Sequence, residues 1–231
     1  MRKVRMVLFT VVLVVSLASA AGAATNLMTN PGAEKMELSP YSGYPQELLT
    51  PRARMAEAIP AQSWGCYPSC GFCTWGVTDK EAHGGKYSAF LAVDGSDSRG
   101  VTELNLCLGQ TDGRSGKYAF VAKAKTTYYF SFWLKGNPAP SAVYVRWLGW
   151  KTEDGSMDAD KREWRDTNLI GKGGIVPGTE WKKYEGTFMT TADTKKFAMR
   201  IQIPVQAAAQ KGQTIYVDDV EISEFSADNI K

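Results

Sequence analysis

The stretch TIYVDDVEI, residues 214–222, lies near the C-terminal end of the chain and has the pattern of a β-strand. β-Branched and aromatic residues dominate it, and apolar side chains recur with a period of two, as in a half-buried β-strand. Ile215 and Val217 are core positions, but two adjacent acids, Asp218 and Asp219, interrupt the alternation. Because neighbouring strand residues point to opposite faces, one acid is expected to face the packed side or a strand end. Such a carboxylate needs a cation, a hydrogen-bond network or a nearby loop to compensate it.

The same alternation recurs in three earlier stretches, at residues 128–135, 142–150 and 197–203. In each of them one parity is apolar, and across the three stretches the other parity carries aromatic, amide and basic groups. Further short strands are expected at 74–77, 86–93, 101–108, 118–124 and 181–188. Residues 35–73 and 153–174 have poor periodicity and predict two long loops, the first with room for one helical turn at 47–59. Many short strands separated by turn signals predict one all-β domain, an antiparallel β-sandwich.

The N-terminus has the pattern of an export signal. Three basic residues precede an apolar run at about residues 6–17, and small residues follow it. We therefore expect residues 1–23 to be a signal peptide, with Ala20 and Ala23 as alternative cleavage positions. The apolar run is shorter than the ~20 residues that a membrane span needs. The mature chain is expected to have no membrane span and to be secreted, periplasmic or attached to the cell surface.

The charge balance excludes some partners. The chain has 27 basic and 24 acidic residues, but three of the basic residues lie in the leader and no acid precedes Thr25. Removing the leader leaves equal numbers of each, without a basic patch, so we expect no nucleic-acid partner. The expected domain covers residues 24–225, and residues 226–231 are expected to form a flexible tail.

Four cysteines follow the leader: Cys66, Cys70, Cys73 and Cys107. An even number in an oxidising compartment favours two disulfides, for which three connectivities exist. We expect one bridge inside the 66–73 segment and one that joins this segment to Cys107. A zinc site made of four thiolates is the alternative, because Cys70 and Cys73 have the spacing of metal ligands.

Five short motifs occur in an order that resembles a known group of proteins. They are NLMTNPGAE at 26–34, HGGKYS at 83–88, YYFSFWLK at 128–135, WKKYEGTF at 181–188 and YVDDVEI at 216–222. Together they resemble the galactose-binding-like jelly-roll carbohydrate-binding modules, the group that contains families 4, 9, 16 and 22. The resemblance implies a jelly-roll sandwich in which the two long loops are insertions.

The resemblance also implies a structural calcium ion. Its ligands would be Glu34, a backbone carbonyl at the Gly85–Lys86 turn, and Asp218. Oxygen ligands from separate segments suit this hard cation. In the alternative interpretation, Asp218 only accepts hydrogen bonds from backbone or hydroxyl groups.

Carbohydrate binding requires a flat aromatic surface beside hydrogen-bonding amides and charged groups. In the family that the motifs resemble, a common glycan groove lies on the concave face of one sheet. The residues expected to line such a groove are Tyr129, Trp133, Tyr144, Arg146, Arg200 and Gln202. Two alternatives stay open: the aromatic residues pack beneath the inserted loops, or sugar binds at an aromatic loop tip that contains Trp64, Tyr67, Phe72 and Trp75.

A catalytic role is not expected. The chain has one histidine, His83, in a Gly-Gly turn, so a serine or cysteine nucleophile has a single possible histidine base. We expect a secreted, non-catalytic protein that binds polysaccharide, alone or beside a separately encoded carbohydrate-active enzyme. The alternatives are a structural or adhesive surface domain that makes protein contacts and, less favoured, a jelly-roll glycan hydrolase or lyase.

Overall fold

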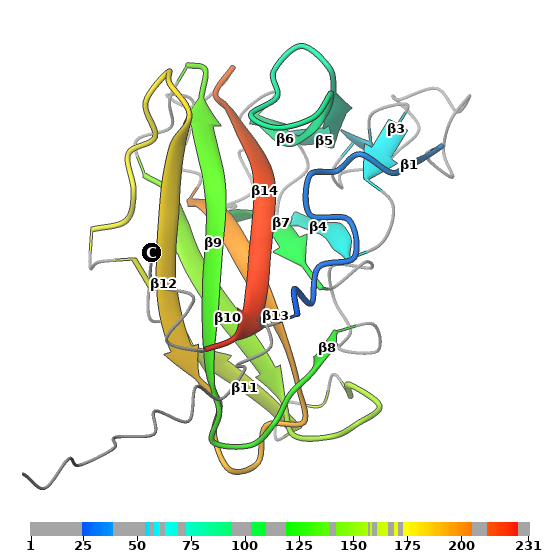
Figure 1. The fold of residues 1–231 in the computed structure, drawn as a ribbon, viewed down its shortest axis with the longest axis vertical. Coiled ribbons are helices and arrows are strands. Elements are labelled where there is room, and N and C mark those ends of the chain that lie inside the picture. The colour runs from blue at the N-terminus through cyan, green and yellow to red at the C-terminus, as the bar shows by residue number, and fades with distance from the viewer. Residues whose placement is uncertain are drawn as a thin grey trace, which may run out of the picture.

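A computed structural model describes residues 25–38, 54–55, 58–60, 63–68, 73–93, 103–109, 119–138, 142–156, 158, 161–165, 169–170, 173–204 and 212–225. Every regular element within these ranges is a β-strand, and most strands belong to two six-stranded sheets that face each other (Figure 1). The expected all-β sandwich is confirmed. None of the described residues belongs to a helix that could cross a membrane.

The first large sheet, called here the β9 sheet, has the strand order β12-β9-β14-β6-β5-β2. Its strands are β2 (Arg54–Met55), β5 (Cys73–Thr78), β6 (Ser88–Val93), β9 (Thr127–Gly136), β12 (Lys182–Met189) and β14 (Thr214–Glu224). Neighbours are antiparallel except β2 and β5, which are parallel. In Figure 1, β12, β9 and β14 lie in front of β10 and β13.

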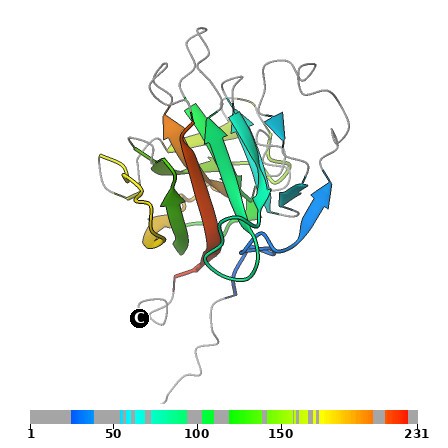
Figure 2. The same ribbon diagram turned by 90° about the horizontal axis from the view of Figure 1, so that it is seen from above.

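The second large sheet, called here the β13 sheet, has the order β11-β10-β13-β7-β4, and β8 also pairs with β13. Its strands are β4 (Trp64–Pro68), β7 (Glu103–Leu108), β8 (Phe120–Val121), β10 (Tyr144–Trp150), β11 (Arg162–Arg165) and β13 (Lys196–Pro204). A small separate sheet joins β1 (Met36–Leu38) to β3 (Ala58–Pro60). Figure 2 shows the layers from above, along the long axis of the domain.

The core lies between the two large sheets and is built by the apolar parity expected from the sequence. On β9 these residues are Tyr128, Phe130, Phe132 and Leu134, all no more than 1% exposed. On β13 they are Phe197, Met199, Ile201 and Ile203, all 0% exposed. Phe197 contacts the rings of Tyr128 and Phe188 across the interface, at centroid distances of 4.7 and 5.2 Å. The alternation therefore identified the core face of each of these strands.

A β-bulge in β14 accommodates the two adjacent acids, Asp218 and Asp219. The register between β14 and β9 shifts between Asp218 and Glu221, and Asp219 has a φ of 46°. The inserted residue lets both Val217 and Val220 enter the core, at 0% and 1% exposure. Neither carboxylate has to face the core.

Some of the segments expected from the sequence lie outside the described residues, and the structure corrects others. The expected signal peptide at 1–23 and the tail at 226–231 lie outside the described residues, as does Cys70. The expected loop at 153–174 contains β11, and the expected loop at 35–73 contains β1, β2, β3 and β4. A helical turn is wrong for the described part of 47–59, where β2 and β3 are strands.

The disulfides stay a prediction, but the register limits the pairing. Cys107 on β7 lies opposite Gly65 of β4, whereas Cys66 lies opposite Leu106. Because adjacent residues of a strand point to opposite faces, the side chains of Cys66 and Cys107 project to opposite sides of the sheet. A bridge between these two is therefore disfavoured.

Candidate functional site

Three chain segments meet beside the bulge and form what we call the acid–turn cluster. It consists of Glu34, Asp218, Asp219 and the turn from His83 to Tyr87. The Oδ2 atom of Asp218 accepts the backbone N–H groups of His83 and Gly84 at 2.8 and 3.1 Å. The Oε1 atom of Glu34 accepts those of Lys86 and Tyr87 at 2.8 and 3.0 Å. The cluster thus ties the N-terminal segment and the last strand to the connection between β5 and β6.

Asp218 is the most constrained member of the acid–turn cluster. Its side chain is fully buried, and its Oδ1 atom also accepts the backbone N–H of Asp219 at 2.8 Å. Burial raises the pKa of Asp218 to about 6, because removal from water disfavours the charged form. The N–H groups of Gly84, His83 and Asp219 oppose this shift, and the charge of Asp219 adds to it.

The donor set of the acid–turn cluster fits a calcium ion in part. Glu34 and Asp218 supply hard oxygen atoms from separate segments, as calcium prefers. The turn, however, directs N–H groups toward both carboxylates, which matches the alternative in which Asp218 accepts hydrogen bonds. Among the described residues no group of three or more His, Cys, Asp or Glu side chains has the arrangement of a metal site. A carboxylate has about four lone-pair positions, so these hydrogen bonds leave acceptor capacity for a cation.

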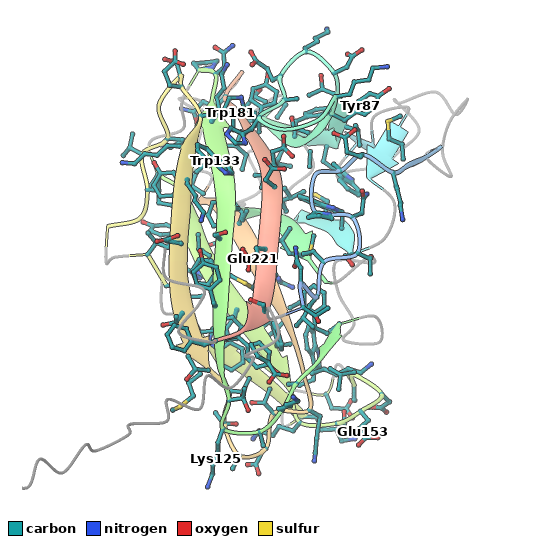
Figure 3. All side chains as sticks on the ribbon, in the orientation of Figure 1. Tyr87, Lys125, Trp133, Glu153, Trp181 and Glu221 are labelled. Carbon is teal, nitrogen blue, oxygen red and sulfur yellow. The ribbon has the colours of Figure 1, made fainter. Side chains whose placement is uncertain are left out.

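An aromatic cluster covers one end of the outer face of the β9 sheet. The ring of His83 stacks on Trp133, with centroids 3.6 Å apart and planes at 16°, and meets the edge of Trp181 at 5.9 Å. Its Nδ1 atom lies 2.7 Å from Oδ2 of Asp219. Figure 3 shows Trp133 and Trp181 together near this end of the sheet, away from Glu221. His83 therefore occupies the face of Trp133 on which a sugar ring would otherwise stack.

Tyr129 lies on the same outer face and is also engaged. Its hydroxyl donates to Oε2 of Glu185 at 2.8 Å and accepts from Nζ of Lys183 at 3.3 Å. Hydrogen bonds from Tyr129 and Lys183 hold the pKa of Glu185 below its ordinary value. The tyrosine is only 4% exposed, so it contributes little open surface.

The outer face of the β13 sheet carries a set of polar side chains that we call the polar ladder. Antiparallel register places Tyr144 opposite Gln202 and Arg146 opposite Arg200. On the other side of β13, Gln202 lies opposite Asn105, and its Nε2 donates to Oδ1 of Asn105 at 3.2 Å. Because directly paired residues share a face, all five side chains project from the same side.

Two side chains of the polar ladder are partly exposed, and the other three are buried. Tyr144 and Arg146 are partly exposed, whereas Arg200 and Gln202 are each 3% exposed and Asn105 is 0% exposed. The guanidinium of Arg146 lies 5.4 Å from the centroid of the Tyr144 ring. A Cβ atom at Gly174, whose φ is 76°, would lie 2.8 Å from Cε1 of Tyr144, so that backbone packs against the ring.

The expected single groove is therefore wrong in one respect. Tyr144, Arg146, Arg200 and Gln202 are brought together, but Tyr129 and Trp133 lie on the outer face of the opposite sheet. The prediction of which residues of these strands face away from the core was correct. Parity shows which side chains leave the core, whereas long-range strand pairing decides the sheet to which each strand belongs.

Sequence reasoning missed Asn105 as a member of the polar ladder. It lies in the stretch ELNLCL, where it is the one amide and has the parity of Cys107. A polar residue on the outward parity of a short strand is a weak signal. Only its pairing with Gln202 joins it to the rest of the ladder.

Comparisons with known proteins find similarity in structure only. No protein-family model and no curated protein matches the sequence. The xylan-binding domain CBM22-1 of Paenibacillus barcinonensis Xyn10C aligns with a TM-score of 0.43 and 11% identity, over 72% of this chain and 88% of that chain. TmCBM61, solved in complex with β-1,4-galactotriose, aligns at 0.42 and 16%, over 87% of this chain and 100% of that chain. The arabinose-bound α-L-arabinofuranosidase MgGH51 aligns at 0.48 and 14%, over 91% of this chain and 28% of that chain. Carbohydrate-binding modules are thus among the solved structures to which this chain is similar.

Proposed function

We propose that the protein binds polysaccharide without cleaving it, through the outer face of the β13 sheet. The observation that supports the proposal is the polar ladder, which gathers an aromatic ring, two guanidinium groups and two amides on one sheet face. A sugar presents an apolar C–H face and a rim of hydroxyl groups. An aromatic ring beside hydrogen-bonding side chains complements both.

The members of the polar ladder have different proposed roles. Tyr144 and Arg146 are partly exposed, so they are the contact residues, with the tyrosine as the stacking surface. Gln202 and Asn105 are buried and hydrogen-bonded to each other, so their orientation is fixed before a ligand arrives. Fixed side chains lose little conformational entropy on binding, which favours affinity.

The outer face of the β9 sheet is less suitable for the same ligand. His83 covers Trp133, and the hydroxyl of Tyr129 is bonded to Glu185 and Lys183. A sugar would have to displace these contacts. The proposal therefore keeps Tyr144, Arg146, Arg200 and Gln202 of the residues expected from the sequence and omits Tyr129 and Trp133.

Affinity electrophoresis in gels that contain xylan, galactan or β-glucan tests the proposal. We expect the wild-type protein to be retarded by at least one of these polymers, with soluble oligosaccharide relieving the retardation. Tyr144→Ala and Arg146→Ala should migrate as if the polymer were absent. Thr187→Ala, an exposed change on the opposite face, should behave as wild type. Equal retardation of Tyr144→Ala and wild type would contradict the proposed site.

We propose that the protein is secreted and non-catalytic. The single histidine supports a non-catalytic role, because its ring is stacked on Trp133 and its Nδ1 atom lies within hydrogen-bonding distance of Asp219. Reducing-sugar release from every polymer that retards the protein is expected to stay at the level of the buffer. Release that depends on the protein would favour the hydrolase alternative.

We also propose that calcium binds at the acid–turn cluster through Glu34 and Asp218. Support comes from the convergence of two carboxylates from opposite ends of the chain on one turn. Because backbone N–H groups already compensate both carboxylates, we expect calcium to add stability and not to be required for folding. A ligand that binds only the folded state raises stability in proportion to the logarithm of its concentration.

A further inference from the structure

A short segment around Ile175 extends the β13 sheet beside the first residues of β10. Ile175 and Val143 form an isolated antiparallel bridge, in which each backbone N–H donates to the carbonyl oxygen of the other residue, at 2.8 and 2.6 Å. Both residues belong to the core, at 5% and 0% exposure, so the bridge is anchored there. Because the pairing is antiparallel, the residue before Ile175 lies beside the residue after Val143. Gly174 is therefore the neighbour of Tyr144, the proposed stacking residue.

Gly174 leaves room for the ring of Tyr144 at this edge of the sheet. Its φ is 76°, and a Cβ atom there would lie 2.8 Å from Cε1 and 3.0 Å from Cδ1 of Tyr144. It would also lie 3.0 Å from the carbonyl oxygen of Val143. The Cδ1–Cε1 edge of the ring thus occupies the space that a side chain at position 174 would take. Val176 is 67% exposed, so the segment is open to solvent next to this contact.

The ring of Tyr144, and not the backbone, is expected to move if a side chain is added at position 174. The two hydrogen bonds of the bridge and the buried side chain of Ile175 hold the backbone. Tyr144 is partly exposed and can change its rotamer. A ring that turns away no longer presents its surface beside Gln202, which lies directly opposite Tyr144 on β13. Binding sites lose affinity when a contact group is displaced even by about 1 Å.

We infer that Gly174 is a positioning residue of the sugar-binding face, an inference that rests on the proposed function. It acts through Tyr144, whose ring lies in the space above a residue without a side chain. Glycine at this position therefore serves binding as well as backbone conformation. The sugar itself need not contact Gly174.

Affinity electrophoresis in the polymer that retards the wild type most strongly tests the inference. Gly174→Ala is expected to raise the dissociation constant by at least about tenfold. Gly173→Ala is the matched control, because Gly173 is exposed, a Cβ atom there would meet nothing within 4 Å, and the constant should change by less than about twofold. Gly212→Ala controls for backbone strain, since Gly212 has a φ of 87° and also has nothing within 4 Å of a Cβ atom. Its affinity should equal that of the wild type.

Two further measurements separate the position of the ring from a general loss of stability. Asparagine adopts a positive φ more readily than alanine but also carries a Cβ atom. Gly174→Asn should therefore lose affinity as Gly174→Ala does, with a smaller decrease of the urea midpoint. Adding Gly174→Ala to Tyr144→Ala completes a double-mutant cycle, in which the midpoint should fall less than it does when the ring is present.

The outcomes distinguish this inference from the proposed function. Wild-type retardation of Gly174→Ala and Gly174→Asn, with none for Tyr144→Ala, would overturn the inference and leave sugar binding in place. An equal loss of affinity in Gly212→Ala would also overturn it, because strain would then be the cause. So would equal midpoint shifts with and without the ring. If no polymer retards the wild type, the proposed function fails, and the inference fails with it.

Discussion

Asp218 is expected to give the protein a stability term that is lost as the pH rises. Its carboxyl group is 0% exposed, and burial raises its pKa from 3.8 to about 6. The folded state therefore binds a proton more tightly than the unfolded chain does, and the term is fully present below about pH 3.8. It disappears as the pH rises through about 6. One pKa unit corresponds to about 1.4 kcal/mol, so the whole term amounts to about 3 kcal/mol.

Asp218→Asn isolates this term, because asparagine is neutral at every pH and has nearly the same shape. Urea unfolding of both proteins, followed by tryptophan fluorescence with a chelator present, gives their free energies of unfolding from pH 4 to pH 7. We expect the value for wild type minus that for the variant to fall by about 2–3 kcal/mol over this range. Asp193→Asn removes an exposed loop carboxylate and serves as the control, with an expected change below about 0.5 kcal/mol.

Two results would be incompatible with a raised pKa of Asp218. A constant difference between wild type and Asp218→Asn would mean that burial does not perturb this carboxyl group. A difference that grows with pH would mean that the N–H groups of His83, Gly84 and Asp219 outweigh burial and lower the pKa.

The remaining predictions concern backbone strain, the core and the metal. Gly85 has a φ of 61° and a Cβ atom there would collide with the carboxylate of Glu34, so Gly85→Ala should cost about 2–4 kcal/mol. Gly212 also has a positive φ, of 87°, but a Cβ atom there would meet nothing within 4 Å. Gly212→Ala should therefore cost only about 1 kcal/mol in the same urea titration. Equal costs for the two variants would mean that the collision at Gly85 does not contribute. Phe197→Ala should cost about 3–5 kcal/mol, since the ring is fully buried, and a cost below about 1 kcal/mol would contradict the described core. Calcium at 100 times its dissociation constant should stabilise the protein by about 2.7 kcal/mol, a gain that EDTA reverses and Glu34→Gln reduces; identical melting temperatures with calcium and with EDTA would reject the metal proposal.

The sequence is a good guide to what is local. Alternation on β9, β10 and β13 identifies the inward residues, because a period of two follows directly from strand geometry. The order of the five motifs also indicates that Glu34, the turn at Gly85–Lys86 and Asp218 belong together, and the structure brings them to one place. The bulge at Asp219 is not visible in the composition, since it depends on how β14 pairs with β9.

The sequence is a poor guide to what depends on strand pairing. Trp133 and Tyr144 have the same outward parity, yet they lie on opposite outer faces because β9 and β10 belong to different sheets. The same ambiguity hides the contact of Asn105 with Gln202, residues separated by nearly 100 positions and joined only through the pairing of β7 with β13. The stacking of His83 on Trp133 depends on the path of the turn between β5 and β6 over the sheet. Alternation carries no information about that path.

Side-chain NMR spectra would show whether sugar binds on the outer face of the β13 sheet. A titration of ¹⁵N-labelled protein with an oligosaccharide of the polymer that retards it most strongly would follow the Nε–H group of Arg146 and the side-chain amides of Gln202 and Asn105. We predict saturable shifts of these signals and unchanged indole N–H signals of Trp133 and Trp181. Saturable shifts of the two indole signals, with the signals of the polar ladder unchanged, would place the sugar on the β9 sheet instead.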